Sequence, residues 1–335
     1  MKIACKCTNL VCCIVLMALA GATALWGQAG GFAYVANCGD VCGGIGPGNV
    51  SAYTIDRATG ALVPVTGSPF SAGTNAVSVT VHPTGQFAYV ANRGSNNVSA
   101  YSIDGATGAL TPVDGSPFPT GANPTSVTVH PTGQFAYVAN QSSTNVSAYS
   151  IDGTSGALTP VGGSPFPAGA APTSVTVDPT GQFAYVANAT SNDVSAYTID
   201  GTTGALVPVI GSPFPAGGNP ESVTVNLTGQ LAYVANHGSN NVSAYSINGT
   251  TGELSGVFGS PFPAGLAPRS VAVDPTGQFA YVANEGSANV SAYTIDGTTG
   301  ALVPVFGSPF PAGSGPDSVT TTAGPPAPAV TGAKK

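Results

Sequence analysis

A unit of 48 residues repeats along most of this chain, almost letter for letter. The hexapeptide FAYVAN marks the unit, and its tyrosine recurs every 48 residues from Tyr89 to Tyr281. Tyr34 and Tyr89 are 55 residues apart, so the first unit carries a seven-residue insertion. A fixed period of this length indicates an array of small supersecondary units. Each unit can bury its apolar faces only against its neighbours.

The unit from Pro124 to Gly169 is typical of all of them. Alternating apolar residues and turn signals predict four strands, at Ser126–Val129, Phe135–Ala139, Val146–Ile151 and Ala157–Val161. Pro160 lacks an N–H group, which places the fourth strand at a sheet edge. Four short antiparallel strands per unit are typical of a β-propeller blade. A parallel β-helix is the alternative, but its coils are shorter and lack these hairpin turns.

The two ends of the array complement each other. The first unit opens on a second strand, Phe32–Ala36, and has no first strand before it. After the last fourth strand, Ala301–Val305, comes a first strand without a successor, Asp317–Thr320. We therefore expect Asp317–Thr321 to join the N-terminal blade and close the ring, which removes free sheet edges. The predicted fold is an all-β propeller of six four-stranded antiparallel blades, spanning residues 30–321.

Residues 1–29 have the features of an export signal. Lys2 and Lys6 give a positive start, and Leu10–Ala20 is an apolar core too short to span a bilayer. Small residues offer cleavage sites at Ala22–Ala24 and Gly27–Ala29. An uncleaved membrane anchor is the alternative. We expect a secreted or periplasmic monomer that meets a membrane only through this segment. The Pro-, Ala- and Gly-rich residues 322–335 are expected to be disordered.

Two cysteines remain after the predicted signal, Cys38 and Cys42. In an oxidising compartment we expect them to form a local disulfide. A metal site is the alternative, but no His or further Cys lies close to them in the sequence, so we expect neither a metal nor a cofactor. The formal net charge is −7, and the sequence has no basic stripe, which argues against a nucleic-acid partner.

Two segments carry a resemblance to a known family. Ser174–Asn188 (SVTVDPTGQFAYVAN) and Asn289–Val305 (NVSAYTIDGTTGALVPV) resemble the blades of YVTN-type propellers and of the neighbouring 6-phosphogluconolactonase (lactonase) propeller family. The resemblance extends over roughly Gly31 to Thr321. It implies a propeller fold, with lactone hydrolysis as an expectation. Lactonase propellers have seven blades, whereas this sequence supplies six, and none of their catalytic residues is matched one by one.

The positions that differ between units point to a possible site. In a propeller, the loops between second and third strands and the connections between blades open around the central channel. Directly after the hexapeptide the residues are Cys38, Arg93, Gln141, Ala189, His237 and Glu285. At the start of the first strand they are Val77, Thr125, Thr173, Glu221, Arg269 and Asp317. We call these two positions of each unit the ring positions. Only 6% of the chain is charged, yet five titratable residues occupy the ring positions of the last units.

These ring positions supply the candidate ligand-binding residues, which are Arg93, Glu221, His237, Arg269, Glu285 and Asp317. The candidate catalytic residues are His237, Glu285 and Arg269. His237 or Glu285 could act as a general base, and Arg269 could hold an anionic group or stabilise an oxyanion. Ordinary sequence drift in loops is the alternative explanation of such polar residues.

Two function classes follow from the sequence. The favoured one is a secreted, non-catalytic propeller whose channel face binds a small molecule, an extracellular protein or a glycan. The alternative is a lactone hydrolase. The remaining histidines, His82 and His130, occupy a turn position held elsewhere by Asp or Asn, so we expect one turn hydrogen bond from each and no catalysis.

Overall fold

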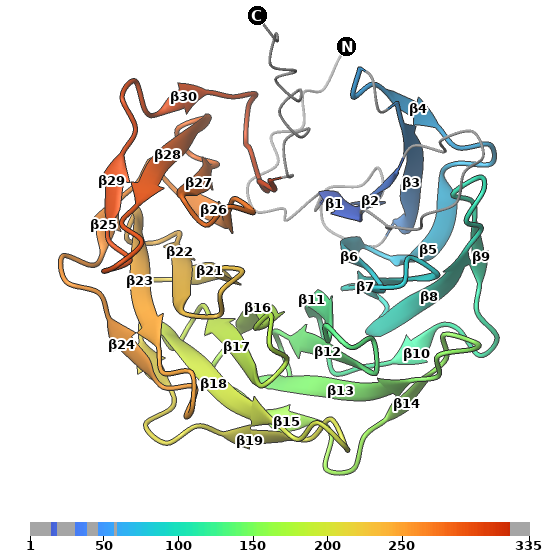
Figure 1. The fold of residues 1–335 in the computed structure, drawn as a ribbon. Coiled ribbons are helices and arrows are strands. Elements are labelled where there is room, and N and C mark those ends of the chain that lie inside the picture. Colours follow the sequence, from blue (N-terminus) through green and yellow to red (C-terminus); the bar gives the residue numbers. More distant parts are fainter. Residues whose placement is uncertain (1–14, 19–30, 39–45, 57–58, 322–335) are drawn as a thin grey trace, which may run out of the picture.

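The computed structural model describes residues 15–18, 31–38, 46–56 and 59–321. These residues form strands, turns and loops, arranged as six sheets that follow one another around a ring (Figure 1). None of them belongs to a helix long and apolar enough to cross a bilayer. The prediction of an all-β propeller is confirmed. We call the sheets the first to the sixth blade, in chain order.

Each blade contains five strands. The first blade comprises β1 (Val15–Ala18), β2 (Phe32–Asn37), β3 (Pro47–Ile55), β4 (Leu62–Pro64) and β5 (Phe70–Thr74). The second comprises β6 (Ala76–Val81), β7 (Phe87–Asn92), β8 (Asn97–Ile103), β9 (Leu110–Pro112) and β10 (Phe118–Pro119). The third comprises β11 (Pro124–Val129), β12 (Phe135–Asn140), β13 (Asn145–Ile151), β14 (Leu158–Pro160) and β15 (Phe166–Pro167).

The second half of the ring repeats this plan. The fourth blade comprises β16 (Pro172–Val177), β17 (Phe183–Asn188), β18 (Asp193–Ile199), β19 (Leu206–Pro208) and β20 (Phe214–Pro215). The fifth comprises β21 (Pro220–Val225), β22 (Leu231–Asn236), β23 (Asn241–Ile247), β24 (Leu254–Gly256) and β25 (Phe262–Pro263). The sixth comprises β26 (Pro268–Val273), β27 (Phe279–Asn284), β28 (Asn289–Ile295), β29 (Leu302–Pro304) and β30 (Phe310–Pro311).

The outer strand of each blade is broken into two pieces, which the sequence did not predict. In the third blade both β14 and β15 pair with β13, through Tyr149 opposite Pro160 and Val146 opposite Phe166. Residues 163–167, which follow the predicted fourth strand, therefore end in a short strand. Pro160 and Pro165 have no N–H group to donate, so the ladder cannot run unbroken between them.

Tyrosine hydroxyls join neighbouring blades. Tyr89 of the second blade donates to the carbonyl of Gly156 in the third at 3.0 Å, and the same bond recurs between four other pairs of neighbouring blades. Gly156 adopts φ +75°, and a Cβ there would lie 2.4 Å from the ring of Phe87. The glycine thus permits both the turn and the close approach of the aromatic ring.

The apolar cores lie between blades and not within them. Tyr89 and Val98 of the second blade pack with Val138 and Tyr149 of the third in one buried cluster, and the other blades pair in the same way. Every residue of β12 is buried. Because both faces of this second strand are covered, its repeated residues stabilise the ring and are not available to a ligand.

The predicted closure of the ring is not what the structure shows. The edge of β2 that was expected to receive Asp317–Thr321 pairs instead with β1, with Val15 opposite Val35. Residues 317–321 lie beside β26, where the Val319 N–H donates to Ser270 Oγ at 3.3 Å. Each blade has its own sheet, and the first and sixth do not pair with each other among the described residues. A strand close in sequence costs less loop-closure entropy than one nearly 300 residues away.

The two turn histidines do more than was predicted. His82 Nδ1 lies 2.7 Å from Thr84 Oγ1 in its own turn, and its Nε2 lies 2.8 Å from the carbonyl oxygen of Gly133 in the next blade. His130 makes the same pair of contacts, with Thr132 and Gly181. Both imidazole rings are buried, and each contacts the neighbouring blade, which agrees with a structural role.

Candidate functional site

The backbone places the two ring positions of each blade side by side. In the fifth blade the N–H of His237, directly after β22, donates to the carbonyl of Asn219, directly before β21, at 2.9 Å. In the sixth blade the N–H of Glu285 donates to the carbonyl of Ala267 at 3.0 Å. Asn219 and Ala267 both have positive φ, so the chain turns sharply there. This local geometry presents the variable side chains together at the channel mouth.

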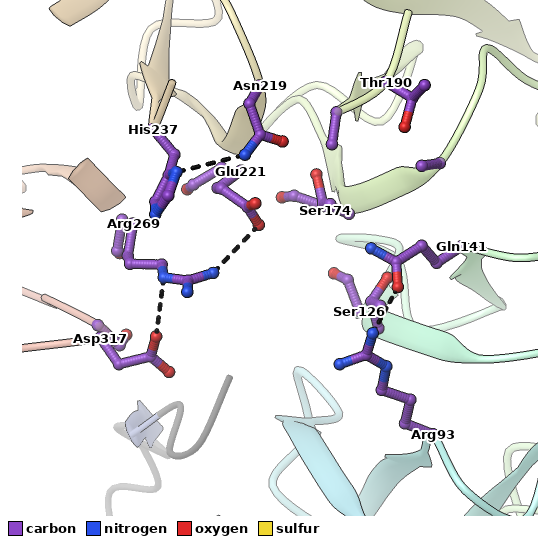
Figure 2. A pocket seen from close by; sticks show the side chains of 17 residues that line it. Arg93, Ser126, Gln141, Ser174, Thr190, Asn219, Glu221, His237, Arg269 and Asp317 are labelled. Atoms are coloured by element: carbon purple, nitrogen blue, oxygen red, sulfur yellow. Dashed lines mark hydrogen bonds and ion pairs between the residues drawn. The ribbon is translucent and has the colours of Figure 1, made fainter. Parts of the chain in front are cut away.

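The channel mouth contains a cavity of about 370 Å³. The second to sixth blades and residues 317–318 contribute its lining, which is mainly hydroxyl, amide and charged side chains. Figure 2 shows two facing walls: Asn219, Glu221, His237, Arg269 and Asp317 on one side, and Arg93, Ser126 and Gln141 on the other. The cavity is large enough for a small polar molecule.

Arg269 is the centre of the charged wall. Its Nε lies 2.7 Å from Glu285 Oε2 and 3.7 Å from Asp317 Oδ1, and its Nη1 lies 3.7 Å from Glu221 Oε2. Only 9% of the Arg269 side chain is exposed. The guanidinium therefore holds three carboxylates from different segments in fixed positions.

His237 extends this cluster. Its Nε2 lies 3.7 Å from Glu285 Oε2, and its Nδ1 lies 3.3 Å from the amide nitrogen of Asn219. An amide N–H can only donate, so this contact leaves Nδ1 as the acceptor and puts the ring proton on Nε2, facing Glu285. The imidazole, which lines the cavity, and the carboxylate behind it form an oriented pair, with 26% and 28% of their side chains exposed.

Burial and neighbouring charges shift the pKa values of this wall. Burial raises the pKa of Glu221, while Arg269 and Arg93 act against that rise. Burial and then the charge of Arg269 lower the pKa of His237, against the opposing effect of Glu285. Burial alone would lower the pKa of Arg269, but the hydrogen bond to Glu285 and the three carboxylates outweigh it and raise that pKa. At neutral pH the imidazole is uncharged and the guanidinium is charged.

The opposite wall carries a cation in a different environment. Arg93 Nη2 donates to Gln141 Oε1 at 2.7 Å, so its guanidinium meets a neutral amide instead of a carboxylate. Its positive charge acts on Glu221 on the other wall, where it tends to lower the pKa of the carboxyl group. Arg93 is therefore the cation of the lining whose charge is available to a ligand.

Serine hydroxyls line the cavity between the two walls. Ser126 and Ser174 occupy the same position in the first strands of the third and fourth blades. The Oγ of each accepts a hydrogen bond from the backbone N–H of a valine in the next blade. An oxygen that accepts in this way can still donate its own proton. These side chains offer hydrogen bonds to a polar ligand.

The structure brings together most of the residues that the sequence singled out. Glu221, His237, Arg269, Glu285 and Asp317 form one cluster, and Arg93 stands across the cavity from it. The sequence analysis missed the serines, because it compared only positions that differ between blades. It also missed Asn219, which could have been found as a variable residue one step before the first strand.

The predictions about cysteines and metals stand apart from this cluster. Cys38 is buried, and Cys42 lies outside the described residues, so the disulfide stays a prediction. No group of three or more His, Cys, Asp or Glu side chains in the described part of the chain is placed to hold a metal ion.

Comparisons with known proteins agree with this architecture. A family model described as "Lactonase, 7-bladed beta-propeller" matches residues 48–171 and 167–315. No curated protein sequence matches the chain. Among solved structures, a candidate 6-phosphogluconolactonase from Bacteroides uniformis superposes with a TM-score of 0.74 at 19% identity, covering 85% of this chain and 83% of that one.

A second solved structure is similar to the same extent. The periplasmic gluconolactonase of Pseudomonas aeruginosa has a TM-score of 0.73 at 20% identity, covering 85% of this chain and 84% of that one. A candidate 6-phosphogluconolactonase from Bacteroides fragilis has a TM-score of 0.74 at 19% identity, with 86% and 83% covered. At these identities the likeness shows the fold alone.

Proposed function

Since the chain belongs to the seven-bladed propeller lactonase family, we propose that it hydrolyses a lactone at the channel-mouth cavity. The observation that carries this proposal is the one-sided cluster in which Arg269, three carboxylates and His237 meet beside a cavity of small-molecule size. The family match favours this alternative over the non-catalytic binding role that the sequence alone favoured.

Glu285 is the general base of the proposed reaction. Its carboxylate contacts Arg269 and His237, which both line the cavity, so it is positioned to accept a proton from a water molecule bound there. His237, fixed by Asn219, lies beside the same carboxylate and orients it. The activated water attacks the lactone carbonyl, and the ring C–O bond then breaks to give a hydroxy acid.

Arg269 and Arg93 have different parts in this scheme. Arg269 already faces three carboxylates, so it acts as a positioning residue and not as the oxyanion-binding group considered from the sequence. Arg93 has a neutral partner and can stabilise negative charge that develops on the substrate. The serine hydroxyls would bind the polar groups of the lactone.

Export is part of the proposal. The predicted signal at residues 1–29 supports a secreted or periplasmic location, and one of the similar structures is described as periplasmic. We propose that the chain works as a monomer, because one chain supplies both walls of the channel-mouth cavity.

The test is hydrolysis of a panel of lactones by the full-length protein, which keeps β1 in the first blade. δ-Gluconolactone, its 6-phosphate and simple alkyl lactones are compared with their spontaneous rates. Glu285→Gln is expected to lose about 100-fold or more of kcat, the usual contribution of a general base. The matched control is Glu253→Gln, because Glu253 is exposed in a turn and contacts none of the cavity residues. Turnover that survives in Glu285→Gln would contradict the assignment of the base.

A further inference from the structure

Among the carboxyl groups of the cluster, Glu221 has the fewest contacts that would stabilise a negative charge. Only 14% of its side chain is exposed, and it makes no hydrogen bond to another described residue. Its one close polar contact is Arg269 Nη1, at 3.7 Å. Glu285, by contrast, lies 2.7 Å from Nε of the same guanidinium and is twice as exposed. A buried carboxylate without hydrogen bonds is costly, and a proton removes that cost.

Charge balance points to the same group. The carboxyl groups of Glu221, Glu285 and Asp317 all face the guanidinium of Arg269, and like charges at this separation disfavour full ionisation. Arg93 faces Glu221 from the opposite wall, and the uncharged His237 adds no compensating charge. Asp317 is a stronger acid than Glu221 in the unperturbed state, and Glu285 has the closest cation, so the shared proton belongs on Glu221.

The position of Glu221 suits a second catalytic role. Glu221 and Glu285 contact different nitrogens of one guanidinium, so the two carboxyl groups lie close to each other. Glu221 also lines the cavity directly, on the wall seen in Figure 2. Two carboxyl groups in unlike environments are the arrangement that separates a base from an acid.

We propose that Glu221 is the general acid that protonates the leaving ring oxygen; this inference rests on the proposed lactonase function. Glu285 takes a proton from water as the water oxygen bonds to the carbonyl carbon. The ring C–O bond breaks, and the Glu221 proton passes to the departing alkoxide. The product is a hydroxy acid. A proton then moves from Glu285 to Glu221, directly or through solvent, and restores both groups.

The experiment compares two lactones that differ in leaving group. δ-Gluconolactone expels an alkoxide, which needs a proton, whereas dihydrocoumarin expels a phenoxide, which is stable without one. The variants are Glu221→Gln, Glu221→Thr and Glu285→Gln, with Glu253→Gln as the control. Glu221→Thr is compatible with folding, because Thr125 and Thr173 hold this position in the third and fourth blades.

A general acid gives a distinctive pattern of losses. Both Glu221 variants are expected to lose about 100-fold or more in kcat on δ-gluconolactone and less than about 10-fold on dihydrocoumarin. Glu285→Gln is expected to lose the same factor on both. The pH profile of wild-type kcat on δ-gluconolactone should show an alkaline limb, as Glu221 loses its proton, and the Glu221 variants should lack that limb.

Three outcomes would overturn the inference, and they separate it from the proposed function. Equal losses on both lactones would give Glu221 a binding or structural role. Unchanged kcat in the Glu221 variants, with Glu285→Gln inactive, would remove the acid and keep the lactonase. No turnover of any lactone by the wild-type protein would remove the lactonase and the inference with it.

Discussion

Two positions of the repeat differ in their roles: the tyrosine inside the hexapeptide and the residue directly after the hexapeptide. The tyrosine is the same in every blade, and in the first five blades it is buried and its hydroxyl bonds to the next blade. Four positions further on the residues differ between blades, and Arg93, Gln141, Ala189 and His237 line the channel-mouth cavity. Positions kept identical stabilise the contacts between blades, and positions that differ supply an asymmetric site. Catalysis requires such asymmetry.

The largest effect is expected from Arg269→Thr. The change leaves Glu221, Glu285 and Asp317 without their shared cation, so unfolding free energy at pH 7 should fall by about 3 kcal/mol and lactone turnover should be lost. Without the guanidinium the folded state binds protons more tightly than the unfolded state. The variant should therefore recover stability relative to wild type as pH falls toward about 4.

Urea denaturation at several pH values measures this loss. Arg93→Gln is the control for stability. The guanidinium of Arg93 donates to a neutral amide, so removing it leaves no carboxylate without a hydrogen-bonded cation. Equal stability losses in the two arginine variants at pH 7 would show that the carboxylates do not depend on Arg269.

A smaller effect on stability is expected from removing the tyrosine hydroxyl, and it should be larger in an inner blade than in the last blade. Tyr137→Phe leaves the buried carbonyl of Gly204 without its donor and should cost about 1–2 kcal/mol of unfolding free energy. Tyr281→Phe should cost less than about 0.5 kcal/mol, because no described residue accepts a hydrogen bond from Tyr281 and its side chain is partly exposed. Neither change should alter turnover. A large cost at Tyr281 would mean that the sixth blade has a partner in solution.

His237 gives the pH dependence of the site. Its pKa lies below the ordinary value of about 6.5, so kcat/KM should fall on the acid side only below that pH. Between the folded and unfolded pKa values the unfolded state binds more protons. The stability that depends on the neutral imidazole is therefore complete above about pH 6.5 and is lost as pH falls through this window. A pH–rate profile and urea melts of His237→Gln measure both effects, and a wild-type acid limb above pH 6.5 would be inconsistent with a depressed pKa.

The smallest effect is expected at a repeat position that varies far from the channel. Phe306, after the fourth strand of the sixth blade, is fully exposed, and Phe258 and Ile210 hold the same position in the two preceding blades. The first three blades carry Thr66, Asp114 and Gly162 there. Phe306→Thr should change stability by less than about 0.5 kcal/mol and leave turnover unaltered. A loss of turnover would show that variation outside the channel mouth also matters for catalysis.

The repeat predicted the fold because local signals agree in every unit. Alternation in FAYVAN gave the inner strands, as in β12, and the Asp-Gly turns gave the hairpins. The split outer strand was missed because Phe166–Pro167 is too short to show alternation. Closure was predicted wrongly because sequence alternation identifies a strand but not the edge that it joins: Val15 takes the place opposite Val35, and Val319 lies beside β26.

The site was predicted in outline and not in its chemistry. Charge at variable ring positions located Arg269 and Glu285, since loops of successive blades must meet at the channel. The sequence could not show that Arg269 is buried among three carboxylates, or that Arg93 has a neutral partner. Those facts depend on side-chain directions set by the whole ring, and they changed the role of Arg269 from oxyanion binding to positioning.

The most direct test resets the ring positions of the fifth and sixth blades to those of the fourth. The substitutions are Glu221→Thr, His237→Ala, Arg269→Thr and Glu285→Ala, which copy Thr173 and Ala189. The measurement is δ-gluconolactone turnover together with the melting temperature. We predict that turnover falls to the spontaneous rate while the melting temperature is kept, because Glu221 and Glu285 are removed together with the cation that they contact. Turnover close to that of the wild-type protein would contradict the claim that these positions form the catalytic site.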